Sequence, residues 1–139
     1  MAREILATLA LDKAGEVPVL SYTLSERLSE VPCWSVQIED GATALETLLG
    51  QRATLALRVS GAQGRGETAP RSFAGLVTEA ARDVSVSGRA VLKLTLRPAL
   101  AVLELAVHST LFQNRSSVDI LKEVLARNGI KHQRLNNSP

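Results

Sequence analysis

Six runs of alternating apolar and polar residues constrain the fold of this chain more than any other feature of its sequence. Successive side chains of an extended strand point to opposite faces, so alternation with a period of two predicts half-buried strands. The clearest run, 33–39, places Trp34, Val36 and Ile38 on one face and polar side chains on the other. The runs that we expect to be strands are 4–11, 17–24, 33–39, 53–60, 73–84 and 90–96.

Short turns, rather than long helices, connect these runs. Residues 12–16 are expected to form a turn, and residues 85–88 have the composition of a hairpin connection. Gly75 lies inside the run 73–84, where a glycine indicates a β-bulge or the close approach of another backbone. Strands that follow one another through short turns pair antiparallel. We therefore expect a mainly β fold with one or two short helices, closed into a barrel or split barrel.

One well-defined helix is expected over residues 117–128. Ser116 and Ser117 can each accept a hydrogen bond from the free N–H groups that begin a helix, and Asn128-Gly129 can end it. A helix of this length is unstable alone in water, so we expect the preceding residues to supply the surface on which its apolar face docks. That face consists of Val118, Ile120, Leu121, Val124 and Leu125.

Two other segments have helical character. Residues 42–49 contain helix-forming residues and leucines and end at Gly50, which predicts a short helix. Residues 99–107 are almost wholly apolar, and periodicity does not distinguish a buried strand from a short helix there. Pro98 and the leucine and alanine content favour a helical turn over 99–103.

The composition fits one globular domain over residues 1–139. Hydrophobic residues make up 45% of the chain and charged residues 22%, which allows a modest core. The net charge is +2, and the arginines are spread along the chain, whereas nucleic-acid-binding proteins usually cluster them. Few rings could stack on bases. A nucleic-acid-binding module, an OB-like β-barrel, is therefore the weaker alternative. The aromatic residues are Tyr22, Trp34, Phe73 and Phe112.

No residues in the sequence have the spacing of a catalytic or metal-binding site. His108 and Ser109 are adjacent, and neighbours in a strand point to opposite sides, which argues against a paired nucleophile and base. His132 lies in a polar tail, where we expect it to be solvated, and no cysteine, histidine or carboxylate spacing fits a metal. We therefore predict no catalytic, metal-binding or cofactor-binding residues and no enzymatic activity.

Three further features are expected to be structural. The glycine-rich loop at 61–66 has the spacing G-x-x-G-x-G and leads into a strand, whereas phosphate-binding loops lead into a helix. Cys33, the one cysteine, cannot form an internal disulfide and is expected to be a buried structural thiol. Glu39 and Asp40 end a strand, where a solvated turn is expected.

No targeting or membrane-spanning segment is visible in the sequence. The first residues include Arg3, Glu4 and Asp12, and no run approaches the roughly 20 apolar residues that span a bilayer. We expect synthesis in the cytoplasm, no stable membrane insertion by this segment, and export, if any, by a route that needs no signal peptide.

From residue 48 onward the sequence resembles a known family. The segments LLGQRATLALR (48–58), SFAGLVTEA (72–80) and the long stretch from Leu92 to Ile130 are similar to the N-terminal region of VgrG proteins. These are the Rhs/Vgr-type spike proteins of bacterial type VI secretion, and they are related to phage tail baseplate hubs. The shared order includes an LLGQ turn, an F-x-G strand, an L-R-P strand end, an L-F-Q-N turn and a helix. The chain departs from the family at Ala99 and Val102, where an aromatic is common, and at Thr110, where an arginine is common.

The resemblance implies a structural hub built from β-barrels, with no cofactor. It implies that three copies form the hub of the full-length spike, which caps a tube of Hcp-type rings and is fired by sheath contraction. It also implies contacts with other baseplate components and, in some systems, with effectors. Family members are several times longer than this chain, so we expect residues 1–139 to be part of a longer spike protein. We also expect exposed apolar surface that favours self-association or burial by neighbouring chains.

Overall fold

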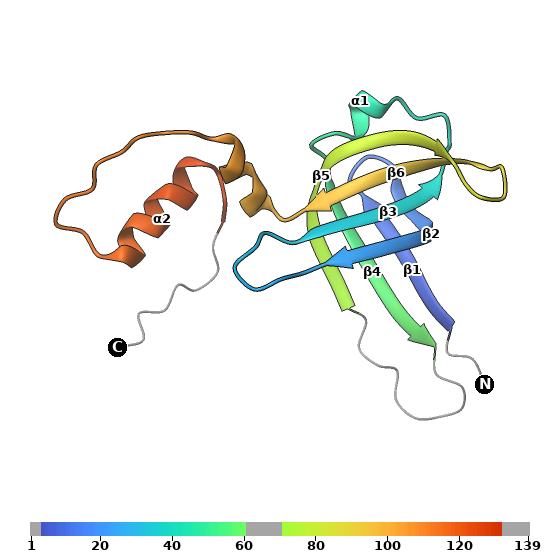
Figure 1. Ribbon diagram of the computed structural model, residues 1–139, viewed down its shortest axis with the longest axis horizontal. Helices are drawn as coiled ribbons and strands as arrows, with labels where there is room; N and C mark the ends of the chain where they lie inside the picture. Colours follow the sequence, from blue (N-terminus) through green and yellow to red (C-terminus); the bar gives the residue numbers. More distant parts are fainter. Residues whose placement is uncertain (1–3, 61–70, 132–139) are drawn as a thin grey trace. The chain divides into compact units, whose positions relative to one another are not determined.

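The computed structural model describes residues 4–60 and 71–131 (Figure 1). The chain divides into two compact units, Met1–Pro98 and Ala99–Pro139. The alternating runs of the sequence lie in the first unit, and the C-terminal helix lies in the second.

The first unit is a closed barrel of six antiparallel strands, ordered β1-β2-β3-β6-β5-β4 (Figure 1). This confirms the predicted mainly β fold and, of the two forms considered, the closed barrel. Each alternating run of the sequence corresponds to one strand, with bounds that differ by at most two residues at either end. The strands are β1 (Glu4–Leu11), β2 (Gly15–Ser25), β3 (Cys33–Glu39), β4 (Arg52–Ser60), β5 (Arg71–Val84) and β6 (Ala90–Arg97).

Two pairings between strands far apart in the sequence close the barrel. β1 pairs with β4, with Leu9 opposite Leu55, and β3 pairs with β6, with Val36 opposite Leu94. Residues directly opposite in an antiparallel pair share a face of the sheet, so each of these pairings brings apolar residues together. The period-two pattern thus places one apolar face of every strand inside the barrel.

The barrel interior is filled mainly by aliphatic side chains. Leu9, Leu55 and Leu96 have no exposed surface. The rings of Trp34 and Phe73 pack against each other with centroids 5.3 Å apart and a tilt of 59°, a geometry that aromatic pairs favour. The other buried members of this core are Leu11, Val36, Ile38, Leu48, Ala53, Val77, Leu92 and Leu94.

Gly75 allows β5 to approach the end of β6 closely. A Cβ atom at this position would lie 2.5 Å from the backbone oxygen of Arg97. The predicted close approach is therefore confirmed. The register between β5 and β6 also shifts between Val77 and Glu79, so an irregularity of the ladder lies nearby on the same strand.

The helix α1 (Leu45–Leu48) is shorter than the helix expected over 42–49. The carboxylate of Asp40 accepts a hydrogen bond from the Ala42 N–H at 2.9 Å, and Ala42 has a φ of +59°, which no α-helix can contain. Residues before Leu45 therefore form a loop. Leu48, which is 1% exposed, joins the barrel core from this helix.

The second unit contains the 3₁₀ helix η1 (Ala99–Leu105) and the helix α2 (Ser117–Arg127). η1 confirms helical character after Pro98, although it runs two residues beyond the predicted turn. Ser116, not Ser117, caps α2, because its hydroxyl accepts a hydrogen bond from the Asp119 N–H at 3.2 Å. At the other end Gly129, with a φ of +68°, and Ile130 donate to carbonyls of the last turn, which is a Schellman motif.

The apolar face of α2 is partly covered. Leu125 is buried, Val118, Ile120 and Val124 are half-buried, and Leu121 is 42% exposed. Every member of the barrel core belongs to the first unit. The predicted helix is therefore present. The buried residues of the barrel core, however, come from the strands and α1 and not from α2.

Candidate interaction surfaces

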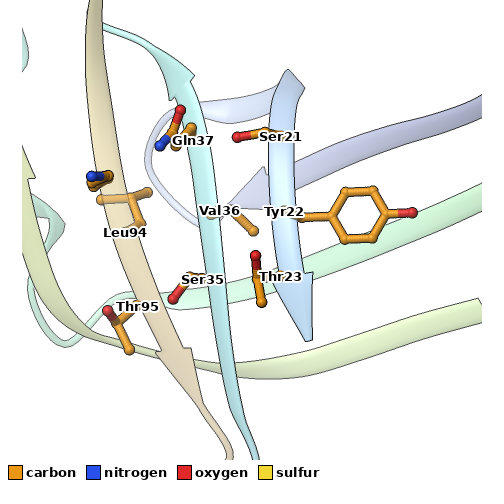
Figure 2. Close-up of a pocket in the computed structure, with 9 residues that line it drawn as sticks. Ser21, Tyr22, Thr23, Ser35, Val36, Gln37, Leu94 and Thr95 are labelled. Carbon is orange, nitrogen blue, oxygen red and sulfur yellow. The ribbon is translucent and has the colours of Figure 1, made fainter. Parts of the chain in front are cut away.

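A strip of polar side chains covers the outer face of β2, β3 and β6. Figure 2 shows Ser21 and Thr23 of β2 and Ser35 and Gln37 of β3 on one side of the sheet, while Tyr22 points away from them. The strip lines a shallow hollow of about 140 Å³. We call it the polar strip, and its members are Ser21, Thr23, Ser35, Gln37, Lys93 and Thr95.

The polar strip follows from the same alternation that builds the core. Trp34, Val36 and Ile38 point inward, so Ser35 and Gln37 must point outward. Hydroxyl and amide groups both donate and accept hydrogen bonds. The strip can therefore exchange hydrogen bonds with the polar surface of a neighbouring protein.

Charged side chains of β5 border the polar strip. The ammonium of Lys93 lies 2.6 Å from a carboxylate oxygen of Asp83, and the Thr95 hydroxyl donates to Glu79 at 3.2 Å. The hydrogen bond from Lys93, with a further one from the Val84 N–H, lowers the pKa of Asp83 below its usual value. A lowered folded-state pKa means that this pair stabilises the fold at neutral pH and loses its effect as pH falls through that pKa. The pair is exposed, so salt screens it.

Arg82 of β5 fixes the loop that precedes α1. Its Nε donates to the carboxylate of Asp40 at 3.0 Å, and its guanidinium also donates to the backbone oxygen of Thr43 at 2.7 Å. The side chain of Asp40 is 11% exposed. The expected solvated turn at Glu39 and Asp40 is thus wrong for Asp40, whose carboxylate is paired and largely covered, while Glu39 is exposed.

Gln51 of the LLGQ turn joins two segments at one end of the barrel. It is 8% exposed, and its amide nitrogen donates to the Thr47 carbonyl at 2.5 Å. Its amide oxygen accepts from the Lys13 N–H at 3.3 Å, which connects α1 to the turn between β1 and β2. The LLGQ turn therefore has a structural role, and the sequence alone did not reveal these contacts.

The L-F-Q-N turn of the second unit leads the chain into α2. Phe112 lies beneath the guanidinium of Arg127, 6.0 Å from ring centroid to carbon, and Asn114 adopts a φ of +54°. The Arg127 guanidinium also pairs with Glu123 at 2.5 Å, and Arg115 pairs with the same carboxylate. A hollow of about 210 Å³ lies between the segment 103–112 and α2.

The two residues considered as a nucleophile and base, His108 and Ser109, do not line the same hollow. His108 lines the hollow beside α2, whereas Ser109 does not. Cys33 is partly exposed at the start of β3, so the expectation of a buried thiol is wrong. The glycine-rich loop 61–66 and His132 lie outside the described residues.

The described residues do not support a base-stacking surface. Trp34 and Phe73 are each 5% exposed and belong to the barrel core, and Tyr22 and Phe112 are half-buried. Within residues 4–60 and 71–131 no three His, Cys, Asp or Glu side chains gather as a metal site would require. In the same part of the chain, no helix has the length and apolar character needed to cross a bilayer.

The fold and a family comparison together indicate the class of protein to which the chain belongs. A closed antiparallel barrel with a few short helices is consistent with a hub-type β-barrel. The family model described as "Phage tail baseplate hub (GPD)" matches residues 25–139, and the chain belongs to this family. A search of curated proteins gave no match. Membership of a family of structural baseplate proteins indicates a structural role in a tail hub.

Proposed function

We propose that this chain is the hub part of a VgrG-type spike of a type VI secretion machine. The observation that carries the proposal is the ordered set of VgrG-like segments inside the family match, from LLGQ at 48–51 to the helix that ends before Gly129. The contacts of Gln51 and the position of Phe112 support it, because they give the LLGQ and L-F-Q-N turns definite structural roles.

In this role the chain is a structural component that maintains the shape of the hub. Three copies would form the hub of the full-length spike and cap a tube of Hcp-type rings, in contact with other baseplate components and, in some systems, with effectors. The protein would be made in the cytoplasm without a signal peptide and leave the cell when the sheath contracts. It would need no cofactor and catalyse no reaction.

Deletion of the gene in the bacterium that encodes the chain tests the proposal. We expect the tube protein to disappear from the culture medium while it stays present in the cells, because a tube without its cap is not assembled and fired. Expression of the intact gene from a plasmid should restore release, and a cytoplasmic enzyme measured in the same medium controls for lysis.

Two results would contradict the type VI assignment. Unchanged release of the tube protein after deletion would refute an essential role in secretion. Loss of phage-like tail particles, with tube-protein release intact, would assign the hub to a phage tail and leave the family membership standing.

A further inference from the structure

The segment 106–112 lies between η1 and α2 and is not one of the barrel strands (Figure 1). Its side chains alternate in the way that those of a β-strand do. Its even-numbered residues line the hollow beside α2. On its odd-numbered side, Val107 is 93% and Leu111 81% exposed, and Ser109 is exposed as well. Side chains that alternate in direction over seven residues are typical of an extended backbone, with one side lining the hollow and the other side open. His108 and Thr110 line the hollow but are themselves exposed. The even-numbered residues are Ala106, His108, Thr110 and Phe112.

The backbone of this segment is available for pairing. Among the described residues, no hydrogen bond joins a backbone group of residues 107–113 to the backbone of another segment. Solvent-exposed N–H and C=O groups along an extended chain are a template for a second strand. The open side also presents two large aliphatic side chains, which favours a partner that covers them.

Contacts with α2 hold the segment in place before any partner arrives. Phe112 lies against the Arg127 guanidinium, and that guanidinium also donates to the Thr110 hydroxyl at 3.5 Å. A strand whose side chains are already positioned loses less conformational entropy on pairing. The segment is thus better prepared for pairing than a free loop of the same sequence.

Two copies of the segment are complementary to each other when they run antiparallel. With Ser109 at the centre, Val107 faces Leu111 of a second copy, and His108 faces Thr110. Each aliphatic residue then meets another aliphatic residue on the open side, and no formally charged residues oppose each other, since none of residues 106–112 is Asp, Glu, Lys or Arg. A contact of this kind is isologous, which is the commonest symmetry of homo-oligomers.

We propose that residues 106–112 form an antiparallel β-pair with the same segment of a second copy of this chain, centred on Ser109. The contact is two-fold, so it is separate from the contacts of the proposed trimer, and it does not depend on the proposed hub function. A single pair of strands is only marginally stable in water, so the dimer should be weak and concentration-dependent.

Cysteine crosslinking of the full 139-residue chain tests the register. Cys33→Ser first removes the partly exposed native thiol. Directly opposite residues of an antiparallel pair have Cα atoms about 4.5–5.5 Å apart, within the usual disulfide range of about 4.4–6.8 Å. We therefore expect Ser109→Cys to form a disulfide-linked dimer with itself. His108→Cys should crosslink poorly with itself but efficiently when mixed with Thr110→Cys.

Sedimentation of the uncrosslinked protein supplies the second measurement. We expect a monomer–dimer equilibrium whose dissociation constant rises at least tenfold in Ser109→Pro, because proline removes an N–H and disfavours strand pairing. Ser109→Ala is the matched control and should dimerise like the original chain. Circular dichroism of each variant checks that α2 is intact.

Three results would overturn the proposal. One is a chain that stays monomeric at the highest concentration it tolerates. Another is self-crosslinking of His108→Cys that equals that of Ser109→Cys. Inefficient crosslinking at both positions would indicate random collision, and efficient crosslinking at both would indicate parallel, in-register pairing. The third is dimerisation that Ser109→Pro leaves unchanged, which would place the interface elsewhere on the molecule.

Discussion

At the scale of single residues, Gly75 shows how one missing side chain permits a close packing of strands. An added Cβ would lie 2.5 Å from the Arg97 oxygen, 2.9 Å from its carbonyl carbon and 3.1 Å from the Trp34 ring. Two of these atoms are backbone, so they cannot rotate away. We expect Gly75→Ala to lower the free energy of unfolding by about 1–3 kcal/mol, as overpacking usually does. Denaturant unfolding followed by Trp34 fluorescence would measure it.

Gly41 provides the matched control for this substitution. Its nearest neighbour to an added Cβ is the Thr43 hydroxyl at 4.0 Å, which is an ordinary contact. Gly41→Ala should be neutral or should stabilise by a few tenths of a kcal/mol through the unfolded state. Equal losses in the two alanine variants would show that the close approach at Gly75 does not limit the packing.

Single residues also mark the limit of what the sequence predicts. Gly75 could be identified in advance because a glycine inside an alternating run usually marks a bulge or a close backbone approach. Gln51 could not, because its two partners lie 4 and 38 residues away and their proximity depends on the fold. Asp40 was misjudged for the same reason, since its partner Arg82 lies 42 residues further along the chain.

At the scale of elements, α2 depends on its first cap. Ser116 accepts from the Asp119 N–H, and its own hydroxyl donates to the Asp119 carboxylate at 2.7 Å. We expect Ser116→Ala to destabilise the helix by about 1 kcal/mol, within the usual range of about 0.5–2 kcal/mol for a lost cap. Amide hydrogen exchange should show faster exchange of the α2 N–H groups, with the largest change at Asp119.

Ser117→Ala distinguishes capping from a general effect of removing a serine. Ser117 is the first residue of α2, where alanine has the higher helix propensity, so exchange in this variant should be unchanged or slower. If Ser117→Ala accelerated exchange as much as Ser116→Ala, the assignment of the cap to Ser116 would be wrong.

The elements show which sequence patterns are reliable predictors. The alternation of apolar and polar residues located all six strands of the barrel. Each barrel strand has one face toward the core and one toward solvent, so its sequence repeats every two residues. Residues 99–107 were ambiguous, because an apolar run has no period. In the structure, they divide between η1 and the start of the segment 106–112. The helix expected over 42–49 was too long, because a tertiary contact of Asp40 holds its first residues in a loop.

At the scale of the whole molecule, the order of the strands in the barrel could not be predicted from the sequence. Hairpins such as β1–β2 and β5–β6 follow from short turns. The pairings β1–β4 and β3–β6 join strands that are not consecutive, and apolar faces alone do not specify which strands meet. The expectation of a barrel or split barrel therefore rested on strands joined by short turns and on the family resemblance, whereas the closed order comes from the structure.

The division into two units leads to the last prediction. All buried members of the barrel core come from residues 9–96, and about 100 residues are enough for a core of this kind. We expect a chain of residues 1–98 to fold by itself and to unfold in one cooperative transition. Trp34, the one tryptophan, is 5% exposed, so its fluorescence should be that of a buried indole and should shift to longer wavelength on unfolding.

Leu55→Ala in the same shortened chain shows whether this transition reports the barrel core. Leu55 has no exposed surface, and loss of its side chain should cost about 2–5 kcal/mol, depending on how far the cavity collapses. A chain of residues 1–98 that has solvent-exposed Trp34 fluorescence and no cooperative transition would show that the barrel needs residues 99–139 to fold. A folded 1–98 chain that Leu55→Ala destabilises as predicted would establish the barrel as an independent folding unit. The strand pairing of residues 106–112 would then be a property of the second unit.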